Sequence, residues 1–351
     1  MARWIGPDSV RDMKKALGAF LPILLVALVV ACDDDEPSEA SAPGADAAAP
    51  SQNTPDGGPS SQQPPSMEVD PAPEQGLYVA DYRGSIVHMS LDDGTVYKTY
   101  GTEGTGEHQF IQPAKLAATK KHLYIADYGN RRLVRLDRLD GTGWKAWTPG
   151  EGIEPYGVAA FLSEDEKEEI VAFSDYAGMQ FLYAPEGFAG APVVGAKLKF
   201  NTCGVALSKT GGAAGSAGCS SGPALSTIVH PRTGEQVYTG GLTRPDSLAY
   251  LPDGTLVIGD LGSKRVVCVK GASAGNFGKP GSEGDLEFQS VDAVATDLRG
   301  RIYVGDATRN RIVRVDDCNG ASPKVLWDNG SEIDQLTGLV AVGPYLSVRN
   351  P

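Results

Sequence analysis

An aspartate followed five positions later by an arginine recurs three times along this chain. The pairs are Asp127 with Arg132, Asp260 with Arg265, and Asp306 with Arg311. A single pair of this kind could supply a catalytic acid held beside a positive charge. Three copies at one spacing favour a structural device, in which a carboxylate and a guanidinium pair with each other or bond the backbone of a turn.

The segments that carry these pairs are predicted to be β-hairpins. Residues 123–137, 256–270 and 302–316 match almost position for position, and residues 77–90 form a version that is one residue shorter. Each has two short runs of β-branched or aromatic residues around a polar turn. The turn therefore places each aspartate at the end of one strand and each arginine at the start of the next.

The hairpins repeat with a period that indicates a β-propeller. The recurring aspartate stands at positions 81, 127, 175, 260 and 306. The double interval between Asp175 and Asp260 hides a degenerate copy near Ser220, for which we expect four short strands at 205–208, 218–220, 226–230 and 235–239. A period of 40–50 residues with about four strands per unit is typical of propeller blades. The sequence therefore predicts six blades.

The two ends of the predicted head fit each other. The first unit begins at its second strand, residues 77–80, and lacks a first strand. The chain ends with a segment typical of a first strand, 338–342, followed by a further strand-like piece, 345–348. We expect strand 338–342 to complete blade one and close the ring, which removes the open sheet edges. No blade remains for the last piece.

The repeated units resemble NHL repeats. Their form is Pro-x-x followed by three apolar residues, then Leu-Tyr-Ile-Ala-Asp-x-x-Asn-x-Arg, as in the unit that starts at Pro113, with a glycine-rich loop at 101–110 before it. The match covers most of 76–351; it is strongest in blades two, five and six, and blade four lacks both the aspartate and the arginine. The resemblance implies an all-β, six-bladed, NHL-like propeller after a signal peptide and a disordered linker.

The N-terminus has the layout of a secretory signal. An uncharged run at 16–30 follows two lysines and ends in Val-Val-Ala-Cys32, and it is too short to span a bilayer comfortably. This ending resembles a bacterial lipobox, which implies cleavage before Cys32 and acylation of its thiol. Residues 1–31 are thus predicted to be a lipoprotein signal peptide, for which Met13 is an alternative start.

Residues 32–75 are predicted to be a disordered tether. Positions 33–75 carry ten acidic and no basic residues and have almost nothing apolar to bury, so they cannot offset their own ordering entropy. Most of the formal net charge of −13 belongs to this segment. The propeller at 76–351 is only mildly acidic, which argues against nucleic acid as a partner. We expect an exported, monomeric head that acylated Cys32 anchors in a bacterial membrane, with inner and outer membrane both open.

The remaining cysteines are predicted to form two disulfides, since an exported head lies in an oxidising environment. Cys203 and Cys219 are 16 residues apart and lie beside the first strand and on or near the second strand of blade four. Cys268 and Cys318 are placed on the third strands of adjacent blades. No C-x-x-C pair occurs and the four histidines are scattered, so no zinc site is predicted.

One face of the propeller carries the candidate ligand-binding residues. The turns between second and third strands share a face with the loops between blades, and four of these turns carry a base: Arg83, Arg131, Lys264 and Arg309. They lie on four consecutive blades, and such a basic arc could attract an anionic ligand or protein segment. His108, in an interblade loop, is a further candidate.

The sequence favours a binding module over an enzyme. It contains no HExxH, P-loop or EF-hand motif, and no catalytic residue, metal site or cofactor is predicted. We expect an envelope-anchored binding or scaffold module that presents a propeller face to an envelope protein or an anionic ligand. The alternative is a hydrolytic enzyme similar to metal-dependent lactonases or lyases, with calcium in the central channel; that reading is an analogy of fold alone.

Overall fold

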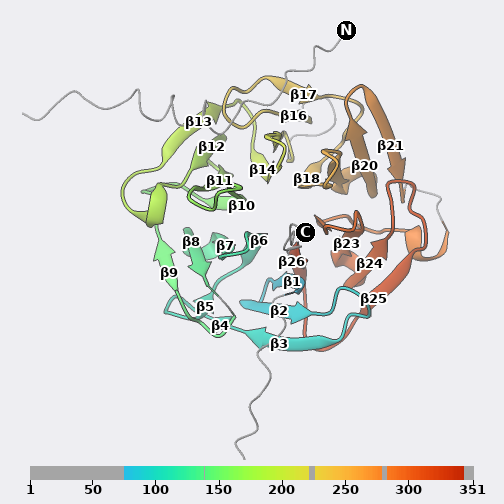
Figure 1. The fold of residues 1–351 in the computed structure, drawn as a ribbon, viewed down its shortest axis with the longest axis horizontal. Helices are drawn as coiled ribbons and strands as arrows, with labels where there is room; N and C mark the ends of the chain where they lie inside the picture. Colours follow the sequence, from blue (N-terminus) through green and yellow to red (C-terminus); the bar gives the residue numbers. More distant parts are fainter. Residues whose placement is uncertain (1–74, 138, 221–225, 279–282, 344–351) are drawn as a thin grey trace, which may run out of the picture. The chain divides into compact units, whose positions relative to one another are not determined.

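Six four-stranded antiparallel sheets surround a central axis in the computed structural model (Figure 1). The structure describes residues 75–137, 139–220, 226–278 and 283–343. The predicted signal peptide, Cys32, nearly all of the predicted tether and the piece at 345–348 lie outside these residues. The chain is thus an all-β, six-bladed propeller, as predicted. In each blade we call the strands A to D from the axis outward.

The blades follow one another along the sequence. Blade one consists of β26 (Leu336–Val342), β1 (Gly76–Asp81), β2 (Ser85–Met89) and β3 (Val96–Tyr100). Blade two consists of β6 (Pro113–Ala118), β7 (Leu123–Asp127), β8 (Arg132–Leu136) and β9 (Lys145–Trp147). Blade three consists of β10 (Pro155–Leu162), β11 (Glu169–Asp175), β12 (Gln180–Tyr183) and β13 (Val193–Lys197).

Blades four to six repeat this order. Blade four consists of β14 (Thr202–Leu207), β15 (Ala213–Ala217), β16 (Thr227–Val229) and β17 (Gln236–Tyr238). Blade five consists of β18 (Pro245–Tyr250), β19 (Leu256–Asp260), β20 (Arg265–Lys270) and β21 (Ser273–Phe277). Blade six consists of β22 (Ala293–Thr296), β23 (Ile302–Asp306), β24 (Arg311–Val315) and β25 (Lys324–Asp328). A short parallel pair, β4 (Thr102–Glu103) and β5 (Gln109–Phe110), lies in the loop between blades one and two.

The last described strand closes the ring, as the sequence predicts. β26 pairs antiparallel with β1, and its register places Leu339 opposite Val79 and Val340 opposite Tyr78. Blade one therefore takes strand A from the C-terminal end and strands B to D from the N-terminal end. The pairing leaves blade one with the same four strands as the other blades.

The core consists of separate apolar clusters between neighbouring blades. Because side chains alternate along a strand, each sheet contributes apolar residues to the blade on either side. Val79 and Val87 of blade one pack with Ile312 of blade six, whereas Ala80 and Ile86 pack with blade two. The blades are thus held together all round the ring by apolar packing.

In blades two, five and six, the recurring aspartate and arginine brace the hairpin against the loop that leads into the blade. The Asp127 carboxylate accepts hydrogen bonds from the Ile111 backbone N–H at 2.9 Å and from Arg132 Nε at 2.7 Å. The Arg132 guanidinium also donates to the Gln109 carbonyl at 2.7 Å. Blades five and six repeat these contacts, with backbone N–H groups of Arg244 and Ser290 on Asp260 and Asp306, and with Arg265 and Arg311 donating to them.

The other three blades vary this brace. In blade one, Ser85 stands in place of the arginine, and its hydroxyl donates to the Asp81 carboxylate at 3.4 Å. In blade three, Gln180 replaces the arginine and donates from Nε2 to the Asp175 carboxylate at 2.8 Å. Blade four has no such aspartate, and there a disulfide joins Cys203 on strand A to Cys219 just after strand B, with a Cα–Cα distance of 6.3 Å. The covalent bond therefore links the end of strand B to strand A in the blade that lacks the aspartate.

Strand B of blade four lies earlier than the sequence predicts. We expected it at 218–220, but β15 spans Ala213–Ala217. Its sequence, Ala-Ala-Gly-Ser-Ala, lacks the large and β-branched residues by which strands are recognised. Small residues are needed here because a Cβ on Gly215 would lie 2.4 Å from the ring of Phe181 in blade three.

The second predicted disulfide, between Cys268 and Cys318, is also present, with a Cα–Cα distance of 6.0 Å. Its position needs one correction. Cys268 lies on β20 as expected, but Cys318 lies in the turn after β24, which ends at Val315. The bond therefore joins a strand of blade five to a turn of blade six.

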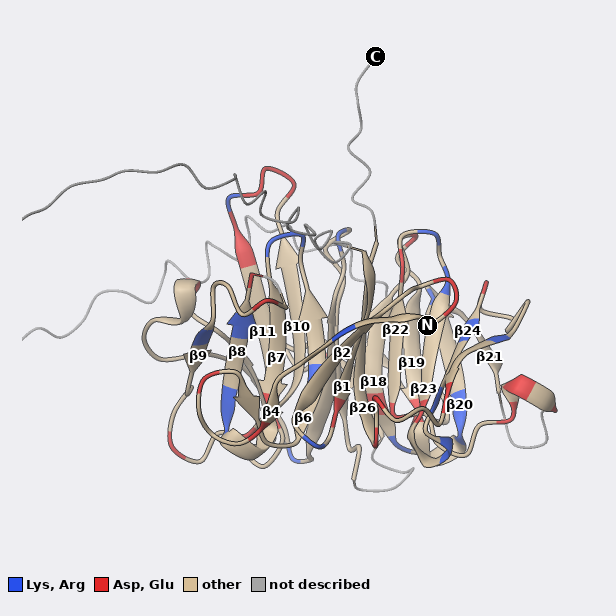
Figure 2. Cartoon of the chain, turned by 90° about the horizontal axis from the view of Figure 1, so that it is seen from below, with Lys and Arg blue, Asp and Glu red and all other residues tan. Residues whose placement is uncertain are grey.

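The propeller has two distinct faces (Figure 2). The B–C turns and the D–A loops form one, which we call the B–C face; the A–B and C–D turns form the other, the A–B face. Gln75, at the start of the described chain, and Val342, at the end of β26, both lie at the A–B face. The described residues include no helix long and apolar enough to cross a membrane.

We predict that Arg132→Gln costs far less stability than Arg132→Ala. Glutamine can keep one hydrogen bond to Asp127, as Gln180 does to Asp175, so we expect a loss of about 1 kcal/mol. Alanine removes the charged partner of a buried carboxylate and should cost about 3 kcal/mol. Urea unfolding of the two variants measures the difference, and equal losses would show that a neutral hydrogen-bond donor cannot replace the guanidinium.

Candidate functional site

A buried lysine joins four blades near the central axis. Lys115, on strand A of blade two, has a side chain that is only 8% exposed. Its Nζ lies 2.6 Å from Asp246 Oδ2 in blade five, 2.6 Å from the Asp292 carbonyl in blade six and 2.9 Å from the Thr337 carbonyl in blade one. An ammonium group has three N–H donors, so these acceptors satisfy all of them.

The lysine stands at a position where the other blades have small residues. In blade two, Lys115 is the third residue counted from Pro113 at the start of strand A. The residues at the equivalent position, in the order of blades three, four, five, six and one, are Gly157, Gly204, Ser247, Ala293 and Gly338. Small residues fit because neighbouring strands A approach closely; a Cβ on Gly157 would lie 1.9 Å from the Cys203 carbonyl. Lys115 is the exception that reaches across the axis.

Three tyrosines gather beside this lysine at the B–C face. Tyr128 and Tyr176 lie in the B–C turns of blades two and three, and Tyr156 lies at the start of β10. Their ring centroids are 5.5–6.3 Å apart, and Lys115 Nζ lies 5.4 Å from the Tyr156 ring centroid. All three side chains are partly exposed. Together they form an aromatic surface, which we call the tyrosine cluster.

Burial and nearby carboxylates raise the pKa of two of the three tyrosines. Burial raises the pKa of Tyr156 well above its ordinary value, and the Asp246 carboxylate, to which the Tyr156 hydroxyl donates at 3.4 Å, adds to the shift. Burial also raises the pKa of Tyr128, with a contribution from Glu154. Tyr128 and Tyr156 are therefore neutral hydrogen-bond donors at physiological pH.

The axial residues do not fit the calcium site that the enzymatic alternative requires. Calcium takes six to eight oxygen ligands, but here the ammonium of Lys115 lies where the Asp246 carboxylate and two carbonyl oxygens converge. Within the described ranges, no three or more His, Cys, Asp or Glu residues are grouped so that they could hold a metal ion. We therefore derive no metal-dependent step.

The four bases of the predicted arc lie at the B–C face, but each contacts a different residue of a D–A loop. Three of them pair with carboxylates: Arg83 with Asp334 at 2.7 Å, Arg131 with Glu154 at 3.1 Å and Arg309 with Glu287 at 2.8 Å. Lys264 Nζ donates to the Gln289 side chain at 3.4 Å. The charges of the three arginines are thus largely compensated, which weakens the attraction of the arc for an anion.

His108 lies apart from both the arc and the tyrosine cluster. Its ring hydrogen-bonds to the Tyr100 hydroxyl and packs edge-on against Trp144, with ring centroids 5.3 Å apart. Its other nitrogen lies 3.5 Å from a Glu107 carboxylate oxygen. These contacts place it at the junction of blades one and two, where it packs against aromatic side chains.

Sequence reasoning missed Lys115 and the tyrosine cluster. Aligning the blades on the proline of strand A would have exposed the lysine, because the other five blades have Gly, Ser or Ala at that position. For the tyrosines, the signal is weaker: Tyr128 and Tyr176 each directly follow a recurring aspartate. Their approach to Tyr156 depends on how blades two and three are packed.

Comparisons with known proteins identify the fold. No family model matches the sequence, and no curated protein matches it. A chain in a crystal structure of a Nidogen/Laminin complex is similar with a TM-score of 0.59 and 16% identity, over 76% of this chain and 98% of that one.

Two further solved structures are similar at this level. A protein of unknown function from Bacteroides caccae has a TM-score of 0.54 and 14% identity, over 76% of this chain and 98% of that one. The Cps50 (Swd1) β-propeller domain from Myceliophteria thermophila has a TM-score of 0.50 and 12% identity, over 78% of this chain and 91% of that one. At these identities the likeness is one of fold.

We predict that Lys115→Met strongly destabilises the propeller. The substitution leaves the Asp246 carboxylate, whose side chain is 5% exposed, without its charged partner, which should cost about 3–5 kcal/mol. Adding Asp246→Asn removes the buried charge and should restore much of this loss. Chemical denaturation of the single and double variants measures both effects.

The matched control is Lys270→Gln. Lys270 pairs with Asp253 at the same 2.6 Å, but both side chains are more than half exposed, so the change should cost less than about 1 kcal/mol. If Lys115→Met costs as little as this control, the axial lysine does not hold the blades together.

Proposed function

We propose that this chain is an exported, lipid-anchored binding module whose B–C face receives a protein partner. The observation that carries the proposal is the tyrosine cluster at the B–C end of the central axis. Tyrosine is enriched among the residues that dominate protein interfaces, since it offers a large rigid surface and a hydrogen-bonding hydroxyl. The compensated charges of Arg83, Arg131 and Arg309 fit the polar rim of such an interface.

The fixed support beneath the cluster favours binding. Lys115 connects four blades and lies under Tyr156, so the aromatic ring of Tyr156 is supported by buried charged contacts. A preordered surface loses little side-chain entropy when a partner binds. Tyr82 lies in the B–C turn of blade one, is 40% exposed and adds a further aromatic side chain to this face.

The chain ends support the same orientation. Gln75 and Val342 lie at the A–B face, so a tether that precedes Gln75 attaches there and leaves the B–C face directed away from its attachment point. Two disulfides indicate an exported protein. Acylation of Cys32 and a flexible acidic tether would then carry the head at the surface of a membrane.

We predict that Tyr128→Ala and Tyr176→Ala weaken partner binding. Each removes a partly exposed ring from the cluster, and the loss of an interface anchor typically costs about 2 kcal/mol, roughly thirtyfold in affinity. Chemical cross-linking of the tethered protein in its own envelope, followed by quantitative mass spectrometry, identifies partners that depend on these residues.

Tyr238→Ala is the matched control, because Tyr238 is a partly buried tyrosine on the outermost strand of blade four. Partners of the B–C face should survive this change. Equal recovery of every partner by all three variants, with unchanged unfolding midpoints, would contradict a role for the cluster.

We also predict that Cys32→Ser releases the protein from the membrane fraction. Serine offers no thiol for acylation, and nothing after position 32 is apolar enough to anchor the chain by itself. Membrane fractionation and mass measurement of the N-terminal peptide test the change. A Cys32→Ser protein that stays in the membrane would argue for an anchor other than a lipid on this residue.

A further inference from the structure

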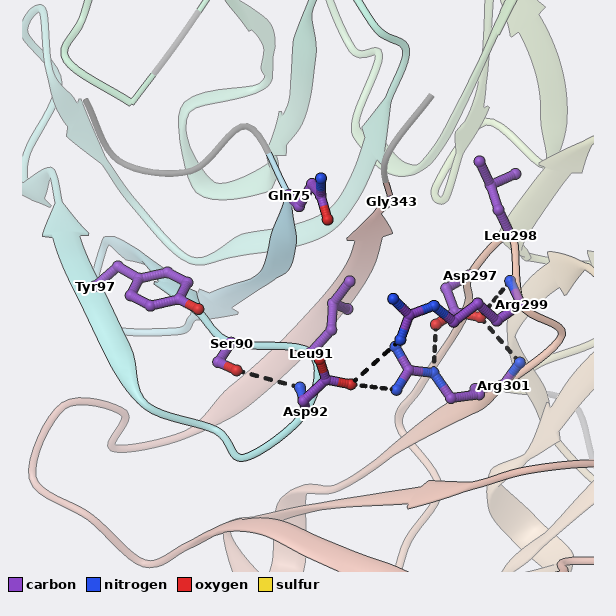
Figure 3. Close-up of a pocket in the computed structure, with 10 residues that line it drawn as sticks. All are labelled: Gln75, Ser90, Leu91, Asp92, Tyr97, Asp297, Leu298, Arg299, Arg301 and Gly343. Atoms are coloured by element: carbon purple, nitrogen blue, oxygen red, sulfur yellow. Dashed lines mark hydrogen bonds and ion pairs between the residues drawn. The ribbon is translucent and has the colours of Figure 1, made fainter. Parts of the chain in front are cut away.

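A cavity of about 440 Å³ lies on the A–B face, where blades one and six meet (Figure 3). Its walls come from the start of the described chain, the C–D turn and strand D of blade one, the A–B turn of blade six and the residue after β26. The lining residues are Gln75, Ser90, Leu91, Asp92, Tyr97, Asp297, Leu298, Arg299, Arg301 and Gly343. Its volume is within the range of sites that hold small organic molecules.

On one wall of the cavity, several cationic side chains share the carboxylate of Asp92. Arg301 is held by the buried Asp297, with Nε 2.6 Å from Oδ2, and it also bonds Asp92. Asp92 is shared further: Arg299 Nη1 lies 3.7 Å and Arg314 Nη1 lies 4.0 Å from the same oxygen. Lys324 Nζ donates to the backbone carbonyl of Asp92 at 2.6 Å. Four cationic side chains thus converge on one turn.

Arg299 is the least satisfied of these cations. Its side chain is 61% exposed, and the one ion pair it makes among the described residues spans 3.7 Å. The acceptor oxygen already receives the closer Arg301. A guanidinium has five N–H donors and binds carboxylates and phosphates in a bidentate manner, so Arg299 retains donors for an anion that enters the cavity.

Three of the lining side chains are apolar or aromatic. Leu298 is 37% and Tyr97 is 43% exposed, and both belong to the few large hydrophobic side chains that the described part of the chain leaves in contact with water. Leu91, which is 8% exposed, lines the cavity between them. An apolar ligand surface placed here would remove water from these side chains.

We propose that this cavity binds a small organic anion, a carboxylate or phosphate ester with an apolar body. The anionic group contacts Arg299 and Arg301 and displaces the exposed carboxylate of Asp92, which now occupies the position that the ligand's anion would take. The apolar body lies against Leu298 and Tyr97. The site lies on the face opposite the tyrosine cluster, so it does not depend on the proposed partner interface.

Isothermal titration calorimetry of the purified full chain tests the proposal with three probes of one shape. Benzoate and phenyl phosphate carry the anion, and benzyl alcohol is their uncharged counterpart. We expect the two anions to bind with dissociation constants on the order of 0.1–1 mM, as small ligands of this size do, and benzyl alcohol to bind at least about tenfold more weakly. Equal affinity for benzyl alcohol would overturn the proposal.

Two variants should change the affinity in opposite directions. Arg299→Gln removes the free guanidinium and should weaken the binding of phenyl phosphate by about tenfold, whereas Asp92→Asn removes the competing carboxylate and should strengthen it by about tenfold. Lys270→Gln, an exposed paired base in blade five, is the control that should leave the affinity unchanged. A merely structural role of Asp92 would not raise affinity, so unchanged or weaker binding in Asp92→Asn overturns the proposal.

A final experiment tests whether the cavity is occupied by a free ligand or by carboxylates of the chain itself. Glu68, Asp70 and Glu74 precede Gln75 in the sequence and carry the same anionic group. In the variant Glu68→Gln/Asp70→Asn/Glu74→Gln, unchanged affinity for phenyl phosphate supports a site that is open to external ligands. Tighter binding would assign the cavity to the acidic tether and overturn the proposal of a free ligand.

Discussion

The pairing of β26 with β1 is the contact on which most of this structure depends. It joins the two ends of the described chain and gives blade one the strand that its own sequence lacks. Without it, two sheet edges would stay open, and an open edge is a site of aggregation. The carbonyl of Thr337, which Lys115 binds, lies on this closing strand. The cavity at the junction of blades one and six lies along the same closure.

The repeated brace shows how one geometry is reached by different chemistry. Asp127 and Arg132 connect a hairpin to the preceding loop through charge-assisted hydrogen bonds, and blade three does so with a glutamine. Blade four replaces the brace by a disulfide between Cys203 and Cys219. The disulfide limits the freedom of the unfolded chain, which suits a blade whose strand B is built from small residues.

The two faces of the propeller offer different chemistry. On the B–C face, Tyr128, Tyr156 and Tyr176 form a neutral aromatic surface over a buried ion pair, and the exposed arginines are compensated by carboxylates. On the A–B face, the one ion pair that Arg299 makes among the described residues spans 3.7 Å, and exposed apolar side chains line the same cavity. A large surface with a rigid aromatic centre suits a protein, whereas a cavity of limited volume suits a small molecule. The two proposals can therefore be tested separately.

The sequence determined the fold because the repeat is local. Each hairpin is marked by alternating residues and by an aspartate and an arginine at fixed spacing, so six blades, ring closure and the structural role of Asp127 with Arg132 could be predicted. The prediction lost accuracy in blade four. There the strand Ala213–Ala217 escaped recognition because its residues are small, as Phe181 of blade three leaves no room for larger side chains. Cys318 was placed on a strand because no residue pattern in the sequence marks the end of β24 at Val315.

The candidate sites were decided by tertiary structure. Lys115 is 131 residues from Asp246 and 222 from Thr337, and only the closure of the ring brings them together. The basic arc was placed correctly on its face, but the sequence could not show that Asp334, Glu154 and Glu287 lie beside it. Periodicity along the chain fixes which residues share a blade and a face. Contacts across the central axis and between blades one and six depend on how all six blades pack, and no local pattern encodes that.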